Sequence, residues 1–161
     1  MEKKTNIEKF KALVSEDIKS KEIPWYLRDT IGVAGKTYFT FCYYNNNQPD
    51  HSLYNKHILP IIDKLNILSL VQIRSNLTFK NLDVIESDYH TDYDSTKLTT
   101  GILFLTKCNA KNYLKINNKE VAIDNIENRM LLFPTNTMHK VKYQTDVYKR
   151  YIINFNFLTK G

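Results

Sequence analysis

The spacing of hydrophobic residues changes once along this chain, near residue 67. Before that point, apolar side chains recur at helical spacing over 6–19 and again over 52–65. This spacing predicts two amphipathic helices, because residues three and four apart share one face of a helix. Between them, Pro24 ends the first helix, and the run 38–44 predicts a strand.

From Leu68 onward, hydrophobic and polar residues alternate in short runs separated by polar turns, as in antiparallel strands. The predicted strands span 68–79, 82–89, 98–106, 112–116, 119–123, 129–133, 139–144 and 149–158. Short strands after a helical segment indicate a closed or sandwiched antiparallel barrel supported by helices. We therefore expect one domain over 1–161, mainly β with N-terminal helices. Its parts are a helical buttress (1–66) and a barrel core (67–159).

Two of these strands have one apolar face and one polar face. The apolar faces carry Val71, Ile73, Leu77, Phe79, Tyr151, Ile153, Phe155 and Phe157. The polar faces carry Gln72, Arg74, Asn76, Thr78, Arg150, Asn154 and Asn156, together with Ile152. A polar face of an antiparallel sheet ordinarily faces water. If the predicted helices cover the apolar face, the polar face instead lines a ligand cavity, and we favour that interpretation.

A small set of residues carries candidate metal chemistry. His90-Thr91-Asp92 places an imidazole and a carboxylate on the same side of an extended backbone. His139, just after a later apolar strand, would complete a triad of two histidines and one carboxylate. Such a triad binds Fe(II) and leaves coordination positions open. An exposed histidine is the alternative for His90 taken alone. The other two histidines, His51 and His57, are expected at the surface or as helix caps.

These ligand types do not fix the metal, because zinc accepts the same set and manganese accepts carboxylate-rich sites. Arg150 favours iron. A guanidinium directed into a barrel needs a partner, and a carboxylate satisfies it in bidentate fashion. Lys149 is a rival anchor on the opposite face of the strand. The alternative for Arg150 is an exposed charge at the end of the strand.

Composition narrows the class of protein. The chain has 161 residues, of which 42% are hydrophobic and 25% are charged, as in a soluble globular domain. No apolar run approaches the roughly 20 residues that span a bilayer. Two distant cysteines give no disulfide framework or zinc ribbon, so we expect a reducing cytoplasm. The net charge of +6 is evenly spread, which argues against a nucleic-acid partner. The oligomeric state is left open.

Several segments extend the candidate triad into a family resemblance. They are Gln72–Leu77, Tyr89–Tyr93, Thr99–Leu105, Glu127–Pro134, His139 and Arg150–Phe157, preceded by Pro24-Trp25-Tyr26. Together they resemble the small prolyl-4-hydroxylase-like, Fe(II)- and 2-oxoglutarate-dependent oxygenases encoded by tailed phages. The abundance of Asn, and of Lys over Arg, also indicates an AT-rich genome such as many phages carry.

The resemblance implies a double-stranded β-helix, or jelly roll. It implies Fe(II) held by His90, Asp92 and His139, with 2-oxoglutarate bound by Arg150 and O2 as the further co-substrate. Arg74 and Asn76 are weaker candidates for holding co-substrate or substrate. Ile152 departs from the pattern, because many relatives carry Ser or Thr there, and another polar group would then have to share the distal carboxylate.

The implied activity is hydroxylation of a peptide or small molecule, with peptidyl proline as the first substrate, coupled to decarboxylation of 2-oxoglutarate to succinate. Two alternatives stay open. One is a non-catalytic jelly-roll module that binds a ligand, and the other is a zinc hydrolase that uses the same triad.

Overall fold

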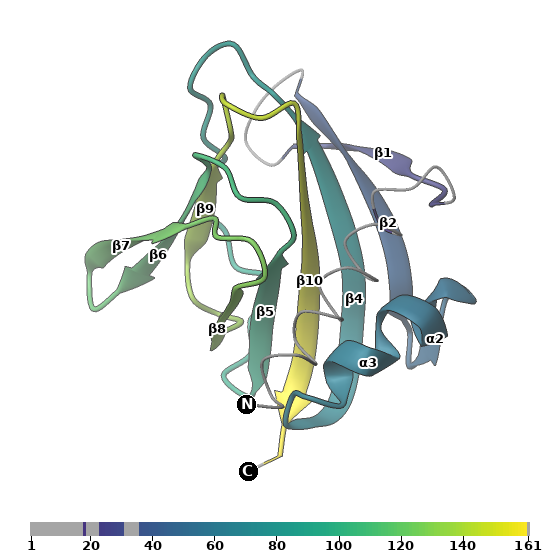
Figure 1. The fold of residues 1–161 in the computed structure, drawn as a ribbon. Helices are drawn as coiled ribbons and strands as arrows, with labels where there is room; N and C mark the ends of the chain where they lie inside the picture. Colours follow the sequence, from purple (N-terminus) through teal and green to yellow (C-terminus); the bar gives the residue numbers. More distant parts are fainter. Residues whose placement is uncertain (1–17, 19–22, 31–35, 161) are drawn as a thin grey trace, which may run out of the picture.

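The structure is a computed structural model that describes residues 18, 23–30 and 36–160 (Figure 1). Its strands are β1 (Tyr26–Asp29), β2 (Thr37–Asn45), β3 (Gln48–Pro49), β4 (Ile67–Phe79), β5 (Leu98–Phe104), β6 (Lys111–Ile116), β7 (Lys119–Asp124), β8 (Met130–Pro134), β9 (His139–Lys142) and β10 (Lys149–Thr159). Two short helices, α2 (Leu53–His57) and α3 (Leu59–Ile62), precede β4. The mainly β prediction is confirmed.

These strands form two antiparallel sheets. The larger sheet has the order β1-β2-β4-β10-β5-β8, with β3 paired to β2, and the smaller has the order β7-β6-β9 (Figure 1). Between them lies a small apolar cluster, to which β5, β6, β8 and β10 contribute Ile102, Phe104, Leu114, Phe133 and Ile152. Two packed sheets joined in this order have the architecture of a jelly roll.

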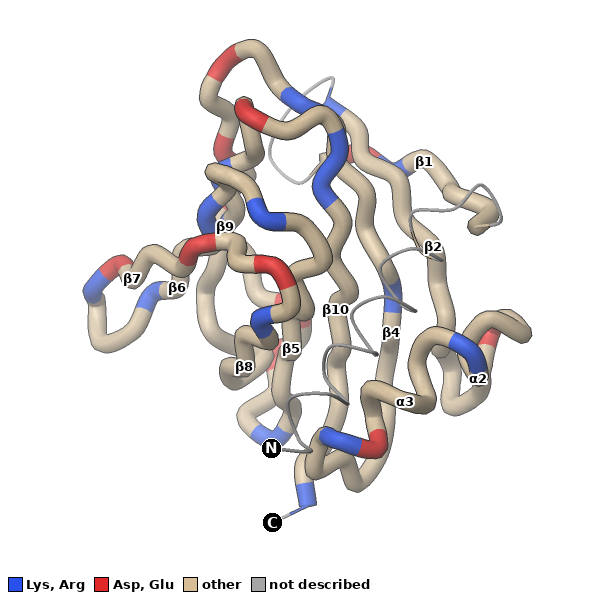
Figure 2. Tube along the Cα trace, in the orientation of Figure 1, with Lys and Arg blue, Asp and Glu red and all other residues tan. Residues whose placement is uncertain are grey.

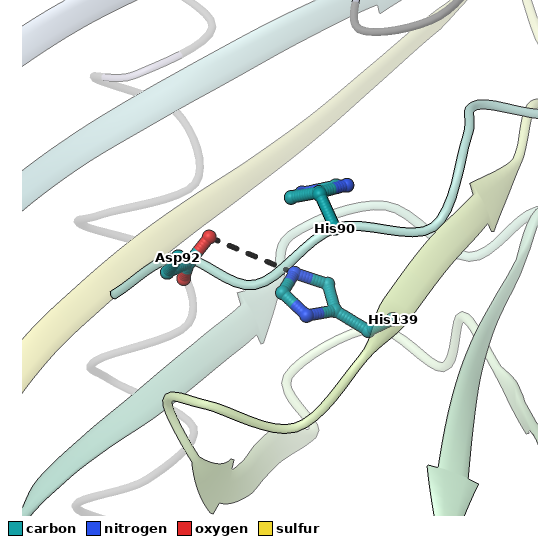
Figure 3. Close-up of side chains that lie close together, drawn as sticks. All are labelled: His90, Asp92 and His139. Carbon is teal, nitrogen blue, oxygen red and sulfur yellow. Dashed lines mark ion pairs between the residues drawn. The ribbon is translucent and has the colours of Figure 1, made fainter. Parts of the chain in front are cut away.

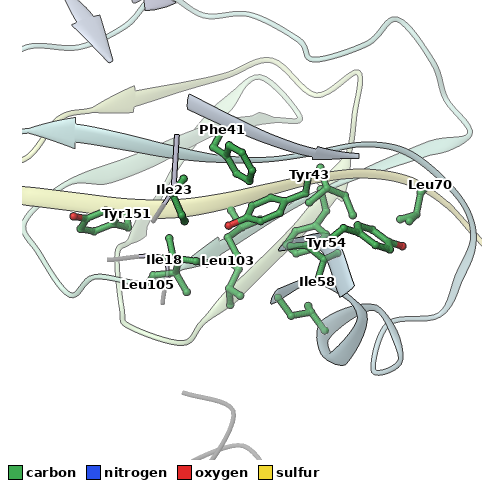
Figure 4. Packing of buried hydrophobic residues seen from close by; sticks show 14 of the residues in the cluster. Ile18, Ile23, Phe41, Tyr43, Tyr54, Ile58, Leu70, Leu103, Leu105 and Tyr151 are labelled. Atoms are coloured by element: carbon green, nitrogen blue, oxygen red, sulfur yellow. The ribbon is translucent and has the colours of Figure 1, made fainter. Parts of the chain in front are cut away.

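The main hydrophobic core lies on the other face of the larger sheet. Tyr54 and Ile58 of the α2–α3 region lie there in one cluster with residues of β4 and β10 such as Leu70 and Tyr151 (Figure 4). Ile18 joins the same cluster. The predicted alternation along β10 is confirmed, because its apolar face is buried under these elements and its polar face is turned toward the smaller sheet.

The helical part departs from the prediction at two places. The helix predicted over 52–65 is interrupted at Ile58, where α2 ends and α3 begins, with Pro60 in the first turn of α3. Proline lacks a backbone N–H and is tolerated only in the first turn, so one continuous helix through Pro60 was wrong. The helix predicted over 6–19 lies outside the described residues, apart from Ile18.

The strand predictions hold for β2 and for all of the later strands except 82–89. That segment has only one isolated bridge, at Glu86, instead of a continuous ladder, and a second isolated bridge follows it at His90. Two short strands, β1 and β3, were not predicted. The turn before β3 uses Asn46 and Asn47, both with positive φ (51° and 63°), a conformation that asparagine tolerates. Because β2 pairs with β4, the larger sheet extends across the predicted division at residue 66.

Charged residues of both signs are interspersed along loops and strand ends, with no extended tract of one sign (Figure 2). This distribution agrees with the scattered lysines of the sequence. Among the described residues, no helix is long and apolar enough to cross a membrane.

Candidate metal centre

His90 and His139 are brought together by a short piece of antiparallel pairing. The backbone N–H of His90 donates to the His139 carbonyl oxygen at 3.0 Å, and that of His139 donates to His90 at 2.9 Å. His139 begins β9, whereas His90 lies in the segment between β4 and β5. Their ring centroids are 4.4 Å apart, and the His139 ring is directed toward Asp92, with the His90 ring beside it (Figure 3). The isolated bridge therefore aligns two side chains that are distant in sequence.

Asp92 directs one carboxylate oxygen toward the histidines and uses the other to hold its position. Its Oδ1 lies 3.6 Å from His139 Nε2. Its Oδ2 accepts hydrogen bonds from Thr100 Oγ1 at 2.9 Å and Asn156 Nδ2 at 3.0 Å. Thr100 belongs to β5 and Asn156 to β10, so the centre of the larger sheet orients the carboxylate. Only 7% of the Asp92 side chain is exposed, which shields this interaction from water.

The tautomers of both histidines follow from their hydrogen bonds. His90 Nδ1 lies 3.2 Å from the Asp88 carbonyl oxygen, and His139 Nδ1 lies 2.9 Å from that of Thr137. A carbonyl oxygen can only accept, so each Nδ1 carries the proton and each Nε2 offers a lone pair. Burial lowers the pKa of His139 below its ordinary value, which also favours the neutral, ligating form.

The three side chains form a set that can hold a metal ion. One potential ligand atom from each of His90, Asp92 and His139 lies within 4.8 Å of the others. Two imidazole nitrogens and one carboxylate oxygen match the donor set that binds Fe(II) in open sites, and zinc accepts it as well. The hydrogen bonds behind each ligand are the kind of outer support that metal sites use.

Arg150 lies in the same cavity as the triad, between the two sheets. Its side chain is buried, and its Nε and Nη2 donate to Asn125 Oδ1 at 2.6 Å and Asn112 Oδ1 at 3.3 Å. Burial lowers the pKa of the guanidinium, because the charged form loses its hydration. Within the ranges that the structure describes, no carboxylate forms an ion pair with Arg150. Lys149, the rival anchor, is exposed on the other face of β10.

Sequence comparison finds no protein-family model and no curated protein that matches this chain. Comparison with solved structures does find similar folds. A Burkholderia pseudomallei oxidoreductase described as a member of the 2OG-Fe(II) oxygenase family superposes with a TM-score of 0.66 at 8% identity, over 91% of this chain and 78% of the other.

A Trichoplax adhaerens prolyl hydroxylase, solved with a hypoxia inducible factor peptide fragment, has a TM-score of 0.56 at 14% identity over 98% and 92% of the two chains. The chain has the fold of the 2OG-Fe(II) oxygenases. A predicted oxalate decarboxylase from Thermotoga maritima also resembles it, with a TM-score of 0.51 at 9% identity over 86% and 96%. The fold therefore does not by itself select the reaction.

Within this oxygenase fold, the two weaker candidates, Arg74 and Asn76, also line the cavity of the triad. Both lie on the face of β4 that is turned toward the smaller sheet. Asn76 is partly committed to the fold, because its Oδ1 accepts a hydrogen bond from Thr40 Oγ1 at 3.0 Å. Arg74 makes no hydrogen bond through its buried Nε to any described residue. The two residues therefore differ in how free they are to bind a ligand.

Sequence reasoning did not find several residues that support the site. Asn112 and Asn125 hold Arg150, and Asn125 Nδ2 also donates to Asn112 Oδ1 at 3.2 Å. Thr100 supports Asp92. Asn112 and Thr100 lie inside predicted strands, and Asn125 just follows one, but nothing local distinguishes them from ordinary polar residues. Asn156 was placed on the cavity face by its period-two spacing from Arg150, without a role.

The expectations for the two remaining histidines have different outcomes. His51 is exposed, as expected, and its Nδ1 accepts the backbone N–H of Leu53 at 3.1 Å. His57 was expected at the surface or as a cap, but it is buried, with Nδ1 at 3.2 Å from the Tyr43 hydroxyl. The expectation for His57 was wrong because its helix packs against β2 in the main core.

Proposed function

We propose that this chain is an Fe(II)- and 2-oxoglutarate-dependent dioxygenase that hydroxylates its substrate. The observation that carries the proposal is the convergence of His90, Asp92 and His139, with ligand atoms within 4.8 Å, in one cavity with Arg150. That convergence occurs in the fold of the 2OG-Fe(II) oxygenases.

The residues present fit the implied metal. His90 and His139 would bind it through Nε2, since each Nδ1 donates to a backbone carbonyl, and Asp92 would bind it through Oδ1. When bound, Fe(II) with 2-oxoglutarate and O2 supplies the oxidising chemistry, in which 2-oxoglutarate becomes succinate and CO2 and the substrate gains a hydroxyl group. The protein supplies ligands, orientation and exclusion of water.

Arg150 would bind the distal carboxylate of 2-oxoglutarate. Two of its five N–H groups are used by Asn112 and Asn125, and the Cys108 thiol is a further neighbour, which leaves N–H groups for a bidentate carboxylate. Because the guanidinium is already desolvated and oriented, binding costs little reorganisation. The two asparagines also provide the polar neighbours that Ile152 does not provide at the position where relatives carry Ser or Thr.

Peptidyl proline is the first substrate to test. The sequence resemblance to prolyl-4-hydroxylase-like enzymes suggests it, and a structural neighbour is a prolyl hydroxylase solved with a peptide. The rivals are a zinc hydrolase with the same triad and a non-catalytic ligand-binding module. Turnover of 2-oxoglutarate separates the proposed function from both, because neither rival consumes it.

The test combines metal binding with succinate formation. We expect the apoprotein to bind one Fe(II) under anaerobic conditions and to release succinate from 2-oxoglutarate in air. Asp92→Ala and His139→Ala should lose both properties, whereas His51→Ala, which changes an exposed histidine outside the cavity, should keep them. Undiminished Fe(II) binding in the two triad variants, or iron binding without any succinate, would contradict the proposal.

A further inference from the structure

The cavity wall beside the triad holds a buried donor and a buried acceptor that lack partners. Arg74 Nε and Asn154 Oδ1 are both inaccessible to solvent, and neither has a hydrogen-bond partner within the described ranges. Buried polar atoms are nearly always hydrogen-bonded, and leaving them unpaired is unfavourable. Because both residues line the cavity, a ligand bound there can supply the two missing bonds once their side chains turn toward it.

These two residues are neighbours across the β4–β10 ladder. Arg74 is the direct partner of Asn154, and both line the cavity that contains the triad. The next residue on this face of β10 is Asn156, about 7 Å further along the strand, and it donates a hydrogen bond to Asp92. Arg150 lies in the opposite direction, about 14 Å from Asn154 along the strand. The two arginines thus serve different ends of the cavity, with Arg74 nearer the triad.

Other polar residues on this wall are already satisfied. Thr78 Oγ1 donates to Gln144 Oε1 at 3.1 Å, and Asn76 Oδ1 accepts from Thr40 at 3.0 Å. Asn156 Nδ2 donates to Asp92. The unpaired atoms are therefore confined to Arg74 and Asn154 among the described residues of this wall.

The net charge of the cavity also points to a ligand at Arg74. The charged side chains that line it are Arg74, Asp92, Lys140 and Arg150. Lys140 is paired outside the cavity, with its Nζ 2.7 Å from Glu86 Oε2. Two positive charges and one negative charge remain. Fe(II) and doubly charged 2-oxoglutarate would cancel each other, so one positive charge stays unbalanced, and Arg74 forms no ion pair with any described residue.

We propose that Arg74 and Asn154 form the subsite for the α-carboxylate and α-nitrogen of an amino-acid substrate. The carboxylate would accept N–H groups of Arg74, and the N–H of the α-nitrogen would donate to Asn154 Oδ1. This inference rests on the proposed oxygenase function. A free amino acid has both groups, and so does a C-terminal residue other than proline. A proline inside a peptide has neither, so this subsite disfavours it.

The test measures ligand binding to the full chain loaded anaerobically with Fe(II) and 2-oxoglutarate. The probes are the common free L-amino acids, tripeptides with a free or an amidated C-terminus, and a peptide with an internal proline. We expect at least one free amino acid or free C-terminus to bind, with affinity reduced about 10- to 100-fold when its carboxylate is amidated. Comparison of the first two probe sets identifies which source of carboxylate is used.

Substitutions of Arg74 then test whether this side chain binds the probe. Arg74→Gln should weaken binding of that probe about 10- to 100-fold and change the Kd of 2-oxoglutarate by less than about twofold. Arg74→Lys, which keeps the charge but not the planar fork, should restore part of the affinity and covers the case in which Arg74→Gln does not fold. Arg28→Gln, on the exposed strand β1, is the matched control and should bind both ligands as the parent does.

Each contrary result has its own meaning. Weaker 2-oxoglutarate binding in Arg74→Gln would assign Arg74 to the co-substrate and overturn the inference alone. So would binding of the internal prolyl peptide or the amidated probes only, or of no probe at all, by protein that binds 2-oxoglutarate. Failure of the parent to bind 2-oxoglutarate would contradict the proposed function and, with it, this inference.

Discussion

The two faces of strand β10 carry different tasks within one stretch of chain. Tyr151, Ile153, Phe155 and Phe157 are buried in the main core with the helical segment and with Ile18 and Ile23. Arg150 and Asn154 alternate with them and line the cavity, and Asn156 on the same face donates a hydrogen bond to Asp92. The apolar face gains stability from burial, whereas the polar face places desolvated hydrogen-bonding groups at fixed intervals.

This comparison shows how a rigid strand can support a site. Packing of Phe155 and the other apolar side chains fixes the backbone of β10. The polar residues that alternate with them are therefore also fixed in position, although they are not part of that core. Arg150, which lines the cavity, and Asn156, which donates to Asp92, are thereby fixed six positions apart along the strand. Substitutions on the two faces should therefore have separable effects, on stability for one face and on ligand binding for the other.

The largest effect is expected on the apolar face. Phe155→Ala should lower the free energy of unfolding by about 3–5 kcal/mol, because a fully buried aromatic side chain is replaced by a cavity. Chemical denaturation of the apoprotein measures this, and Fe(II) binding by the folded fraction should persist. The control is Tyr26→Ala, which removes an aromatic ring that is 63% exposed and should change stability much less. A loss below about 1 kcal/mol in Phe155→Ala would contradict the assignment of this face to the core.

On the polar face, Arg150→Ala should weaken 2-oxoglutarate binding by about 2–4 kcal/mol, the cost of losing one partner of a buried charged interaction. Fe(II) affinity should hardly change, because Arg150 contacts Asn112 and Asn125 and no triad residue. Calorimetry with each ligand separates the two effects. Lys149→Ala, one residue away and exposed, should leave 2-oxoglutarate affinity intact, and a reversed pattern would make Lys149 the anchor.

Asn156 tests the same face at the metal end. Asn156→Ala removes a hydrogen bond to Asp92 Oδ2 and should weaken Fe(II) binding about 10- to 100-fold, as expected for an outer-shell partner of a ligand. Asn154→Ala, two residues earlier on the same face, makes no contact with the triad and serves as the control. Equal Fe(II) affinities in the two variants would show that Thr100 alone orients Asp92.

Much of this arrangement could be predicted from the sequence where the signal is local. The period of two along 150–157 assigned these eight residues of β10 to its two faces, because side chains alternate along a strand. His90 and Asp92 were recognisable because they are separated by one residue. Pro60 was a visible signal that the predicted helix could not be continuous.

Other parts of the site depend on contacts that no local pattern records. Asn112 and Asn125 come from β6 and from the segment after β7, and they meet Arg150 only because the smaller sheet lies over the larger one. The pairing of His90 with His139 is a single bridge in an irregular segment, so the regular strand predicted over 82–89 was wrong. Such contacts are set by tertiary packing, which overrides strand propensity.

The smallest expected effect concerns pH and the neutral state of His139 in the apoprotein. Burial lowers the pKa of His139 in the folded state below its ordinary value of 6.5. The negative charge of Asp92 raises this pKa, and His90 lowers it further. The unfolded chain then binds the proton more readily, so this contribution to stability is complete above pH 6.5 and is lost as the pH falls toward the folded-state pKa. Urea unfolding at pH 7.5, 6.5 and 5.5 should show a smaller acid-induced loss of stability for His139→Gln than for the parent. His51→Gln, at an exposed position, should retain the parental dependence. If His139→Gln also retained it in full, other groups would account for the acid sensitivity, and the buried, neutral imidazole would not be part of it.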